Sequence, residues 1–251
     1  MKAQPGGRVA LVTGGGSGIG RAAAALLARD GCDIILNDVD GAAAEEAGRE
    51  ILALGRRLHL AICDVADVAV LERAVAAAEA ALGRIDVLVN NAGISSRKRT
   101  LEEIDEADFA RMFDVHVKGA FFATRAVVPG MKRRRCGRIV NVASNWALVG
   151  ADNLSHYCGA KAALIGLTRA WARELAPFGI AVNAAVPGTT VTPMITQRLS
   201  DEAIREQGKA ALLGRWARPE EIAETIAFLA SDRASAITGQ LLVANCGQSI
   251  V

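Results

Sequence analysis

The sequence lacks long apolar segments, metal-ligand spacings and a strong net charge, and each absence excludes a class of protein. No stretch offers the roughly 18 consecutive apolar residues that a membrane-spanning helix needs. The formal net charge is only +2, which argues against nucleic acid or an anionic membrane as the main partner. The five cysteines are odd in number and widely scattered, so the sequence predicts reduced thiols and no metal site. Because Met1 to Arg8 lacks the apolar core of a secretion signal, we expect a soluble cytoplasmic protein.

A glycine-rich turn joins the first predicted strand to the first predicted helix. The strand is a β-branched run from Arg8 to Thr13, and the helix is an alanine-rich run from Arg21 to Arg29. Glycines in such a turn let the backbone approach a phosphate, and the next helix offers free N–H groups at its N-terminus. The following strand, Asp33 to Asn37, ends in Asp38, 18 residues past Gly20, where a carboxylate could meet an adenosine ribose. A flexible loop gives the same glycines, but both features together predict a dinucleotide site.

Strand and helix patterns alternate along the rest of the chain. The expected strands lie at residues 58–63, 87–90, 138–143, 181–185 and 240–244, and the expected helices at residues 42–54, 68–82, 106–129, 157 to about 175, and 219–230. This alternation implies an α/β fold with a parallel sheet covered on both faces. Without a linker-like tract, residues 1–251 are expected to form one domain. The segment at about 190–217 is too long for a simple connection and is a candidate substrate lid.

Three polar side chains between residues 144 and 161 suit proton transfer. Tyr157 and Lys161 are four residues apart, so on a helix they share one face. A phenol needs its pKa lowered from about 10 to about 7, or by about 4 kcal/mol, to act as a base near neutrality, and a nearby ammonium supplies part of this. Ser144 follows an apolar run that we expect to be a buried strand, so it lies at the sheet edge. The Tyr-x-x-x-Lys pair alone would more simply be a surface pair of a helix.

These motifs, taken together, resemble those of the short-chain dehydrogenase/reductase family in its compact single-domain form. The resemblance runs from Arg8 to Gly247. The matching motifs are Thr13-Gly14-x-x-x-Gly18-x-Gly20, Asp64-Val65, Asn90-Asn91-Ala92-Gly93, Ser144, Tyr157-x-x-x-Lys161 and Pro187-Gly188 through Thr192. The resemblance to this family implies a Rossmann-type doubly wound sheet of seven parallel strands and a nicotinamide cofactor. It also implies interconversion of a secondary alcohol and a ketone, and commonly a homotetramer.

The resemblance also implies roles for individual residues. Tyr157 would be the general acid/base, Lys161 would bind the nicotinamide ribose and lower the phenol's pKa, and Ser144 would hold the substrate oxygen. With Tyr157 and Lys161, the cofactor-binding residues would be Gly14, Ser17, Gly18, Ile19 and Gly20 near the pyrophosphate, Asp38, Asp64 and Val65 near the adenosine, Asn91, Ala92 and Gly93 near the adjacent ribose, and Pro187, Gly188, Thr190 and Thr192 near the carboxamide. Because the Asp38 carboxylate would bind a ribose diol and repel a phosphate, we expect NAD in preference to NADP.

Two positions depart from the family's pattern, and one aromatic residue has two readings. His116 stands where the family usually has an asparagine that helps shape a helix irregularity. We include it among the candidate catalytic residues because an imidazole, which ordinarily titrates near pH 6.5, should be mostly neutral beside Lys161 and could itself pass protons. The alternative is that His116 only fills the space. Asn245-Cys246-Gly247 replaces the usual Asp-Gly-Gly, which could alter a subunit contact or the C-terminal cover. Trp146, two residues beyond Ser144, either lines the substrate pocket or belongs to the core.

The leading interpretation is an NAD-dependent dehydrogenase for a small or medium secondary alcohol, cyclic and aromatic alcohols included. A 3-oxoacyl carrier-protein reductase shares all these motifs but usually prefers NADP, and the basic surface that it needs could come from Arg97, Lys98 and Arg99. A non-catalytic nucleotide-binding sensor or scaffold is the third alternative, which the intact Ser144, Tyr157 and Lys161 disfavour. The sequence does not identify the substrate.

Overall fold

A sheet of seven parallel strands forms the centre of the molecule. The computed structural model describes residues 7–95 and 98–251. The strands are β1 (Val9–Thr13), β2 (Asp33–Asp38), β3 (Leu58–Ile62), β4 (Val87–Asn90), β5 (Gly137–Val142), β6 (Ile180–Pro187) and β7 (Leu241–Ala244). Their order is β3-β2-β1-β4-β5-β6-β7, and every neighbouring pair is parallel. The order reverses direction between β1 and β4, which creates a crevice at the carboxyl ends of these strands.

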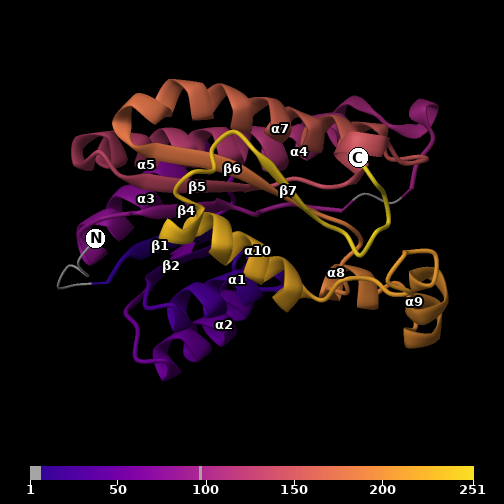
Figure 1. Ribbon diagram of the computed structural model, residues 1–251, viewed down its shortest axis with the longest axis horizontal. Helices are drawn as coiled ribbons and strands as arrows, with labels where there is room; N and C mark the ends of the chain where they lie inside the picture. Colours follow the sequence, from indigo (N-terminus) through magenta and orange to yellow (C-terminus); the bar gives the residue numbers. More distant parts are fainter. Residues whose placement is uncertain (1–6, 96–97) are drawn as a thin grey trace.

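Helices cover both faces of the sheet, as Figure 1 shows. One face carries α1 (Gly18–Arg29), α2 (Gly41–Ala53) and α10 (Pro219–Ala230), and the other carries α3 (Val68–Leu82), α4 (Glu106–Phe113), α5 (Gly119–Arg134) and α7 (Ser155–Leu175). The side chains of successive strand residues point to opposite faces of the sheet. Ala10 therefore packs on the face that α1 covers, whereas Val9 and Leu11 pack on the face that α3 covers. The predicted doubly wound α/β fold is confirmed.

The remaining helices are short and lie in the connections. Those that shape the cavity described below are α6 (Trp146–Val149), α8 (Pro193–Thr196) and α9 (Asp201–Gly208), and single 3₁₀ turns occupy Leu101–Glu103, Ala176–Phe178 and Asp232–Ala234. In Figure 1, α8 and α9 stand beside the sheet and not on either of its faces. The segment expected to be a lid therefore carries two helical pieces joined by irregular chain.

The helix predicted from Glu106 to Pro129 differs from the structure in two respects. A π-helical turn, Asp114–Lys118, separates α4 from α5, so His116 lies inside a helical irregularity. Such π-turns are frequent at functional sites. The helix also continues through Pro129 as far as Arg134, because Val127 and Met131 on either side of the proline are buried against the sheet. Their packing outweighs the one hydrogen bond that a proline removes.

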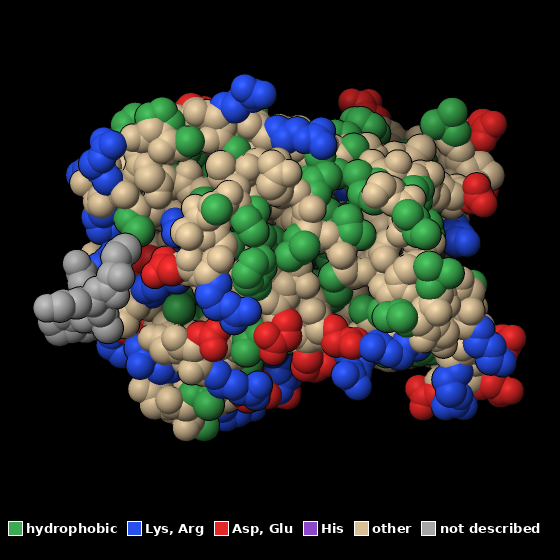
Figure 2. Space-filling view, viewed as in Figure 1, with side chains coloured by type: hydrophobic (Ala, Val, Ile, Leu, Met, Phe, Trp, Pro, Cys, Tyr) green, Lys and Arg blue, Asp and Glu red, His purple; other side chains and the backbone are tan. Residues whose placement is uncertain are grey.

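Charged side chains of both signs are interleaved on the surface. Figure 2 shows many of them along the lower edge, over α1 and α2, where Arg21 of α1 pairs with Glu46 and Glu50 of α2. This mixture agrees with the small net charge of the chain. In the part of the chain that the structure describes, no helix is both long and apolar enough to cross a membrane.

Candidate active site

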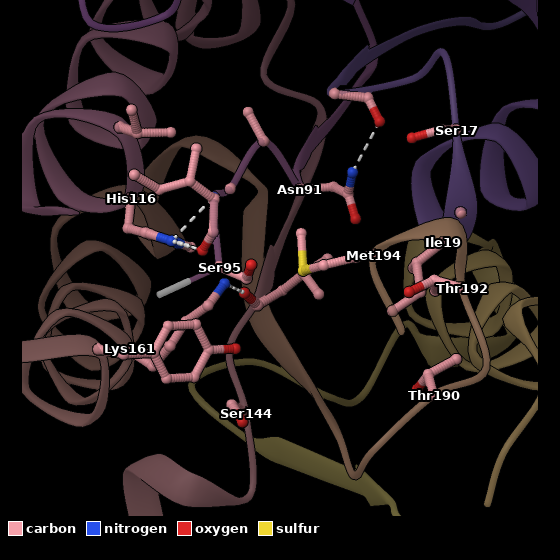
Figure 3. Close-up of a pocket in the computed structure, with 18 of the residues that line it drawn as sticks. Ser17, Ile19, Asn91, Ser95, His116, Ser144, Lys161, Thr190, Thr192 and Met194 are labelled. Carbon is pink, nitrogen blue, oxygen red and sulfur yellow. Dashed lines mark hydrogen bonds between the residues drawn. The ribbon is translucent and has the colours of Figure 1, made fainter. Parts of the chain in front are cut away.

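One cavity of about 890 Å³ opens at the carboxyl ends of the strands. Every candidate site residue from the sequence except Gly20 lines it. The lining comes from the β1–α1 turn, the ends of β2, β4, β5 and β6, the π-turn, α7 and α8. In Figure 3, Ser144, Lys161 and His116 lie on one side of the cavity, and Ser17, Ile19, Thr190 and Thr192 lie on the other. The sheet topology thus brings together residues that are far apart in the sequence.

The glycine turn fits the close approach of an anionic group. Gly14 and Gly18 have φ angles of +64° and +52°, a backbone conformation that glycine adopts without strain. Gly20 fits the helix against the turn, because a Cβ there would lie 2.0 Å from the carbonyl oxygen of Gly14. The first N–H groups of α1 lack partners within the helix, so they can bind a phosphate. Gly20 is therefore required for packing beside the cavity, although it does not line it.

The Asp38 carboxylate lies at the end of β2, where it lines the cavity. Its Oδ2 accepts a hydrogen bond from the Gly16 N–H at 2.8 Å, and its Oδ1 accepts one from the Asp40 N–H at 3.0 Å. Among the described residues, no lysine or arginine forms an ion pair with Asp38. Each carboxylate oxygen keeps a lone pair that can accept a further hydrogen bond. Asp64, which also lines the cavity, forms an ion pair with Arg111 at 2.8 Å.

Ser144, Tyr157 and Lys161 meet where β5 ends against α7. The Ser144 Oγ accepts a hydrogen bond from the Trp146 N–H at 3.2 Å, and the side chains of Ser144 and Tyr157 line the same cavity. The Lys161 Nζ donates to the carbonyl oxygen of Val142 at 2.7 Å and lies 5.9 Å from the centre of the Tyr157 ring. A hydroxyl, a phenol and an amine therefore line one end of the cavity, as the sequence predicted.

Burial dominates the electrostatics of this trio. It raises the pKa of Tyr157 above its ordinary value, and the neighbouring Ser144 hydroxyl opposes that rise. It also lowers the pKa of Lys161 to about 7, because a side chain that is only 4% exposed loses the hydration of its ammonium group. The pKa of the phenol thus shifts in the direction opposite to the expected one. A lysine that titrates near pH 7 is mostly neutral at the higher pH at which this phenol ionises.

His116 is a buried, neutral side chain. It is 2% exposed, and its Nε2 lies 3.1 Å from the Ile94 nitrogen and 2.9 Å from the Ile94 oxygen. Its ring meets the Tyr157 ring edge-on at 5.5 Å, and its Nδ1 has no partner among the described residues. Burial and the neighbouring Lys161 lower its pKa to about 3. The lowered pKa agrees with the expectation that His116 is mostly neutral beside Lys161, and burial, which the sequence does not reveal, is the larger cause.

Comparisons with known proteins agree with this geometry. The chain matches the family model described as Enoyl-(Acyl carrier protein) reductase over residues 14–249. It is 39% identical to the 3-oxoacyl-[acyl-carrier-protein] reductase FabG of Thermotoga maritima, over 94% of this chain and 95% of that protein. It is 38% identical to the cyclohexanol dehydrogenase of an Acinetobacter species, over 94% of this chain and 92% of that protein. The crystal structure of carveol dehydrogenase from Mycobacterium avium in complex with NAD superposes with a TM-score of 0.92 at 30% identity, covering 98% of this chain and 99% of that one.

The chain belongs to the short-chain dehydrogenase/reductase family. It is therefore an enzyme, an oxidoreductase that interconverts a secondary alcohol and a ketone, as the sequence predicted. Membership in this family and the intact trio of Ser144, Tyr157 and Lys161 leave no support for the non-catalytic sensor or scaffold.

Several lining residues of this dehydrogenase/reductase were not predicted from the sequence. They include Ile94, Ser95, Arg111, Val115 and Leu154, whereas Met194, Ile195 and Arg198 belong to the segment that the sequence indicated as a candidate lid. Ile94 and Ser95 directly follow the Asn90-Asn91-Ala92-Gly93 motif, and that position in the chain was the one available signal for them. Trp146 also lines the cavity and is not among the buried core residues, and its contact with a substrate stays a prediction. Among the described residues, no group of histidine, cysteine, aspartate or glutamate side chains could hold a metal ion.

Proposed function

We propose that this enzyme is an NAD-dependent dehydrogenase that oxidises a cyclic secondary alcohol to a ketone, and reduces the ketone in reverse. The observation that carries the proposal is that the hydroxyls of Ser144 and Tyr157 line one cavity together with the Asp38 carboxylate. The first pair recognises a reacting alcohol oxygen, and the carboxylate recognises a ribose diol. The nicotinamide group, when bound, supplies the acceptor for the hydride that leaves the alcohol carbon.

Tyr157 takes the hydroxyl proton of the alcohol, and Ser144 donates a hydrogen bond that holds the same oxygen in place. The phenol must ionise near neutrality for this step, whereas burial alone raises its pKa. A positive charge on Lys161 stabilises the phenolate, and Lys161 would also hold the ribose of a bound cofactor, whose hydroxyl groups would favour the charged form of the amine. The pKa of about 7 for Lys161 means that few such contacts are needed to keep the amine protonated.

Apolar side chains favour a cyclic hydrocarbon substrate. Ile94, Trp146, Leu154, Met194 and Ile195 line the cavity together with Ser144 and Tyr157. Such side chains bury the ring of a cyclic alcohol, and only its hydroxyl then needs a polar partner. Relatives named for cyclohexanol and cyclopentanol support this class. We further propose that residues 190–217, which carry Met194 and Ile195 on and beside α8, close over the bound substrate and exclude water.

Spectrophotometry of the reduced nicotinamide tests this function. The purified enzyme should oxidise cyclohexanol or cyclopentanol with NAD, and the absorbance of NADH should rise. Turnover of a 3-oxoacyl carrier-protein with NADPH, with no activity on cyclic alcohols, would instead establish the alternative reductase. That alternative keeps some support from the relative FabG and from the exposed Lys98 at the cavity. Of the other basic residues considered for it, Arg99 forms an ion pair with Asp108, and Arg97 lies outside the described residues.

Asp38→Ala is expected to remove most of the preference for NAD. In the parent, the Asp38 carboxylate would face the extra phosphate of NADP as a like charge, and such repulsion costs several kcal/mol, so we expect a preference of about 100-fold in kcat/KM. The matched control is Asp40→Ala, which removes an exposed carboxylate two residues away and should keep the preference. Equal efficiencies with both cofactors in the parent would contradict the assignment of NAD.

His116→Asn is expected to leave the pH profile of turnover unchanged between about pH 5 and pH 9. The pKa of His116 is about 3, so the imidazole stays neutral over this whole range. We therefore propose that His116 positions Ile94 and the Tyr157 ring, and does not exchange protons. A shifted acid limb in the variant would instead show that this histidine titrates during turnover.

We also propose that the enzyme is a cytoplasmic homotetramer. All five cysteines are unpaired, which suits a reducing compartment. On the outer face of α5 and α7, Phe121 is 41% exposed and Gly166 has no atom within 4 Å of where a Cβ would lie. The same face of a second copy can pack an aromatic ring above that glycine in a two-fold symmetric contact. Light scattering at about four times the 26.2 kDa chain mass would support this assembly, and a monomer would exclude it.

A further inference from the structure

A turn at the C-terminal end of β7 lies directly against the strip Gly188–Thr190. The Gly188 N–H donates to the carbonyl oxygen of Ala244 at 3.2 Å. The Thr189 N–H donates to the side-chain Oε1 of Gln248 at 2.6 Å. The contact is tight, because a Cβ on Gly188 would lie 2.3 Å from that Oε1. Gly188 therefore makes room for the Gln248 side chain.

Asn245 fixes the turn that presents Gln248. Its side chain is 8% exposed, and its Oδ1 accepts from the Gly247 N–H at 2.9 Å. Its Nδ2 donates to the Ser249 carbonyl oxygen at 2.8 Å and to the Ser249 Oγ at 3.0 Å. The aspartate that the motif more usually carries could accept the first bond but could not donate the other two. The Asn245 side chain thus hydrogen-bonds the residues on either side of Gln248, Gly247 and Ser249.

The same turn also holds the end of the segment 190–217. The N–H of Leu213 donates to the Cys246 oxygen at 3.1 Å, and the N–H of Leu212 donates to the Gly247 oxygen at 3.4 Å. Gly247 has a φ of +76°, and a Cβ there would lie 2.6 Å from the Cβ of Leu212. The turn after β7 therefore hydrogen-bonds both the Gly188–Thr190 strip and this end of the segment 190–217.

We propose that Gln248 is a positioning residue, which fixes the backbone of the Gly188–Thr190 strip for the nicotinamide end of the cofactor. Gly188, Thr189 and Thr190 line the cavity, whereas Gln248 does not, so Gln248 acts through the strip. Without its acceptor oxygen, the Thr189 N–H would lose its partner and the strip would sample other conformations. Binding the cofactor would then include the free-energy cost of ordering the strip. This inference rests on the proposed function.

Titration of the intact enzyme with NADH, followed by fluorescence, tests the role of Gln248. Gln248→Ala should weaken binding by about five- to tenfold, the effect of one lost hydrogen bond. Gln248→Glu keeps an acceptor oxygen and should bind nearly as the parent does. The matched control is Gln240→Ala, at the other end of β7, where the exposed side chain donates only to Thr238. Thermal unfolding of each variant establishes that it is folded.

The outcomes separate the positioning role from the proposed function. Equal affinity of Gln248→Ala and the parent would overturn the role of Gln248, as would a Gln248→Glu variant that binds as weakly as Gln248→Ala. The proposed use of NAD fails on a different observation, namely a parent that binds NADPH and not NADH. In that case the affinities of the same variants for NADPH are measured. The criteria that apply to NADH then support or overturn the positioning role. A parent that binds neither nucleotide would overturn both.

Discussion

Replacing Tyr157 with phenylalanine is expected to reduce turnover by about 1,000-fold, the usual scale for losing a general acid/base. Tyr157 is the only tyrosine in the chain, so no second phenol can take its place. His116 cannot replace it either, because a buried imidazole with a pKa of about 3 is a poor proton acceptor at neutral pH. The phenylalanine ring can keep the edge-on contact with His116, and NADH binding should change by less than about threefold.

The measurement is kcat for a cyclic alcohol, together with the dissociation constant for NADH. Cys158→Ala is the matched control, because it changes the next residue of α7, and Cys158 does not line the cavity. This control should keep most of the turnover of the parent. Near-normal turnover of Tyr157→Phe would refute the assignment of the base and the proton-transfer mechanism with it.

The fold could be predicted because its parallel strands are buried on both faces. All five residues of β1 and all four of β4 are buried, so each strand appears in the sequence as a short apolar run that helical stretches separate. The extent of the helix through Pro129 was not predictable in this way, because packing of Met131 and Val127 decided it. The periodicity gave no sign of the π-turn around His116 either, and only the resemblance to the family implied a helix irregularity at that position.

The polar part of the site was predictable because spacing placed each group at the same edge of the sheet. Its apolar part was predictable only in outline: the sequence indicated Trp146 and the segment that carries Met194 and Ile195, whereas Leu154 lies in a connection and carries no chemical pattern. The direction of each pKa shift was equally hidden. Tyr157 and Lys161 at a four-residue spacing suggested a charged lysine that lowers the pKa of the phenol, whereas burial raises the pKa of Tyr157 and lowers that of Lys161.

The C-terminal turn shows a further limit of sequence reasoning. Asn245 differs from the usual aspartate, but the difference has a physical meaning only once its contacts with Ser249 are known. Gln248 and Thr189 are 59 residues apart, and no motif connects them. The residue that holds the strip was therefore visible only in the structure.

Replacing Lys161 with methionine is expected to abolish most turnover and yet stabilise the fold at neutral pH. Turnover should fall by about 100- to 1,000-fold, the usual cost of removing a charged group that stabilises a developing anion. Methionine fills a similar volume without the ammonium group, whose burial lowers the pKa of Lys161 to about 7. In the variant, the carbonyl oxygen of Val142 loses its 2.7 Å hydrogen bond from Lys161. This loss reduces the gain in stability. A net rise in Tm of about 2 to 4 °C at pH 6 would correspond to about 1 kcal/mol.

The gain in stability from Lys161→Met should shrink as the pH rises from 7 to 10. The pKa of Lys161 is lowered from 10.5 to about 7 in the folded state, so between these values the unfolded chain holds a proton that the folded chain has released. Stability of the parent therefore rises with pH across this window, and the methionine variant lacks that contribution. Thermal unfolding of both proteins at pH 6, 8 and 10 measures the difference, with Lys209→Met as a control because that lysine is exposed. A difference in Tm that stays constant across the three pH values would show that Lys161 remains charged in the folded enzyme throughout.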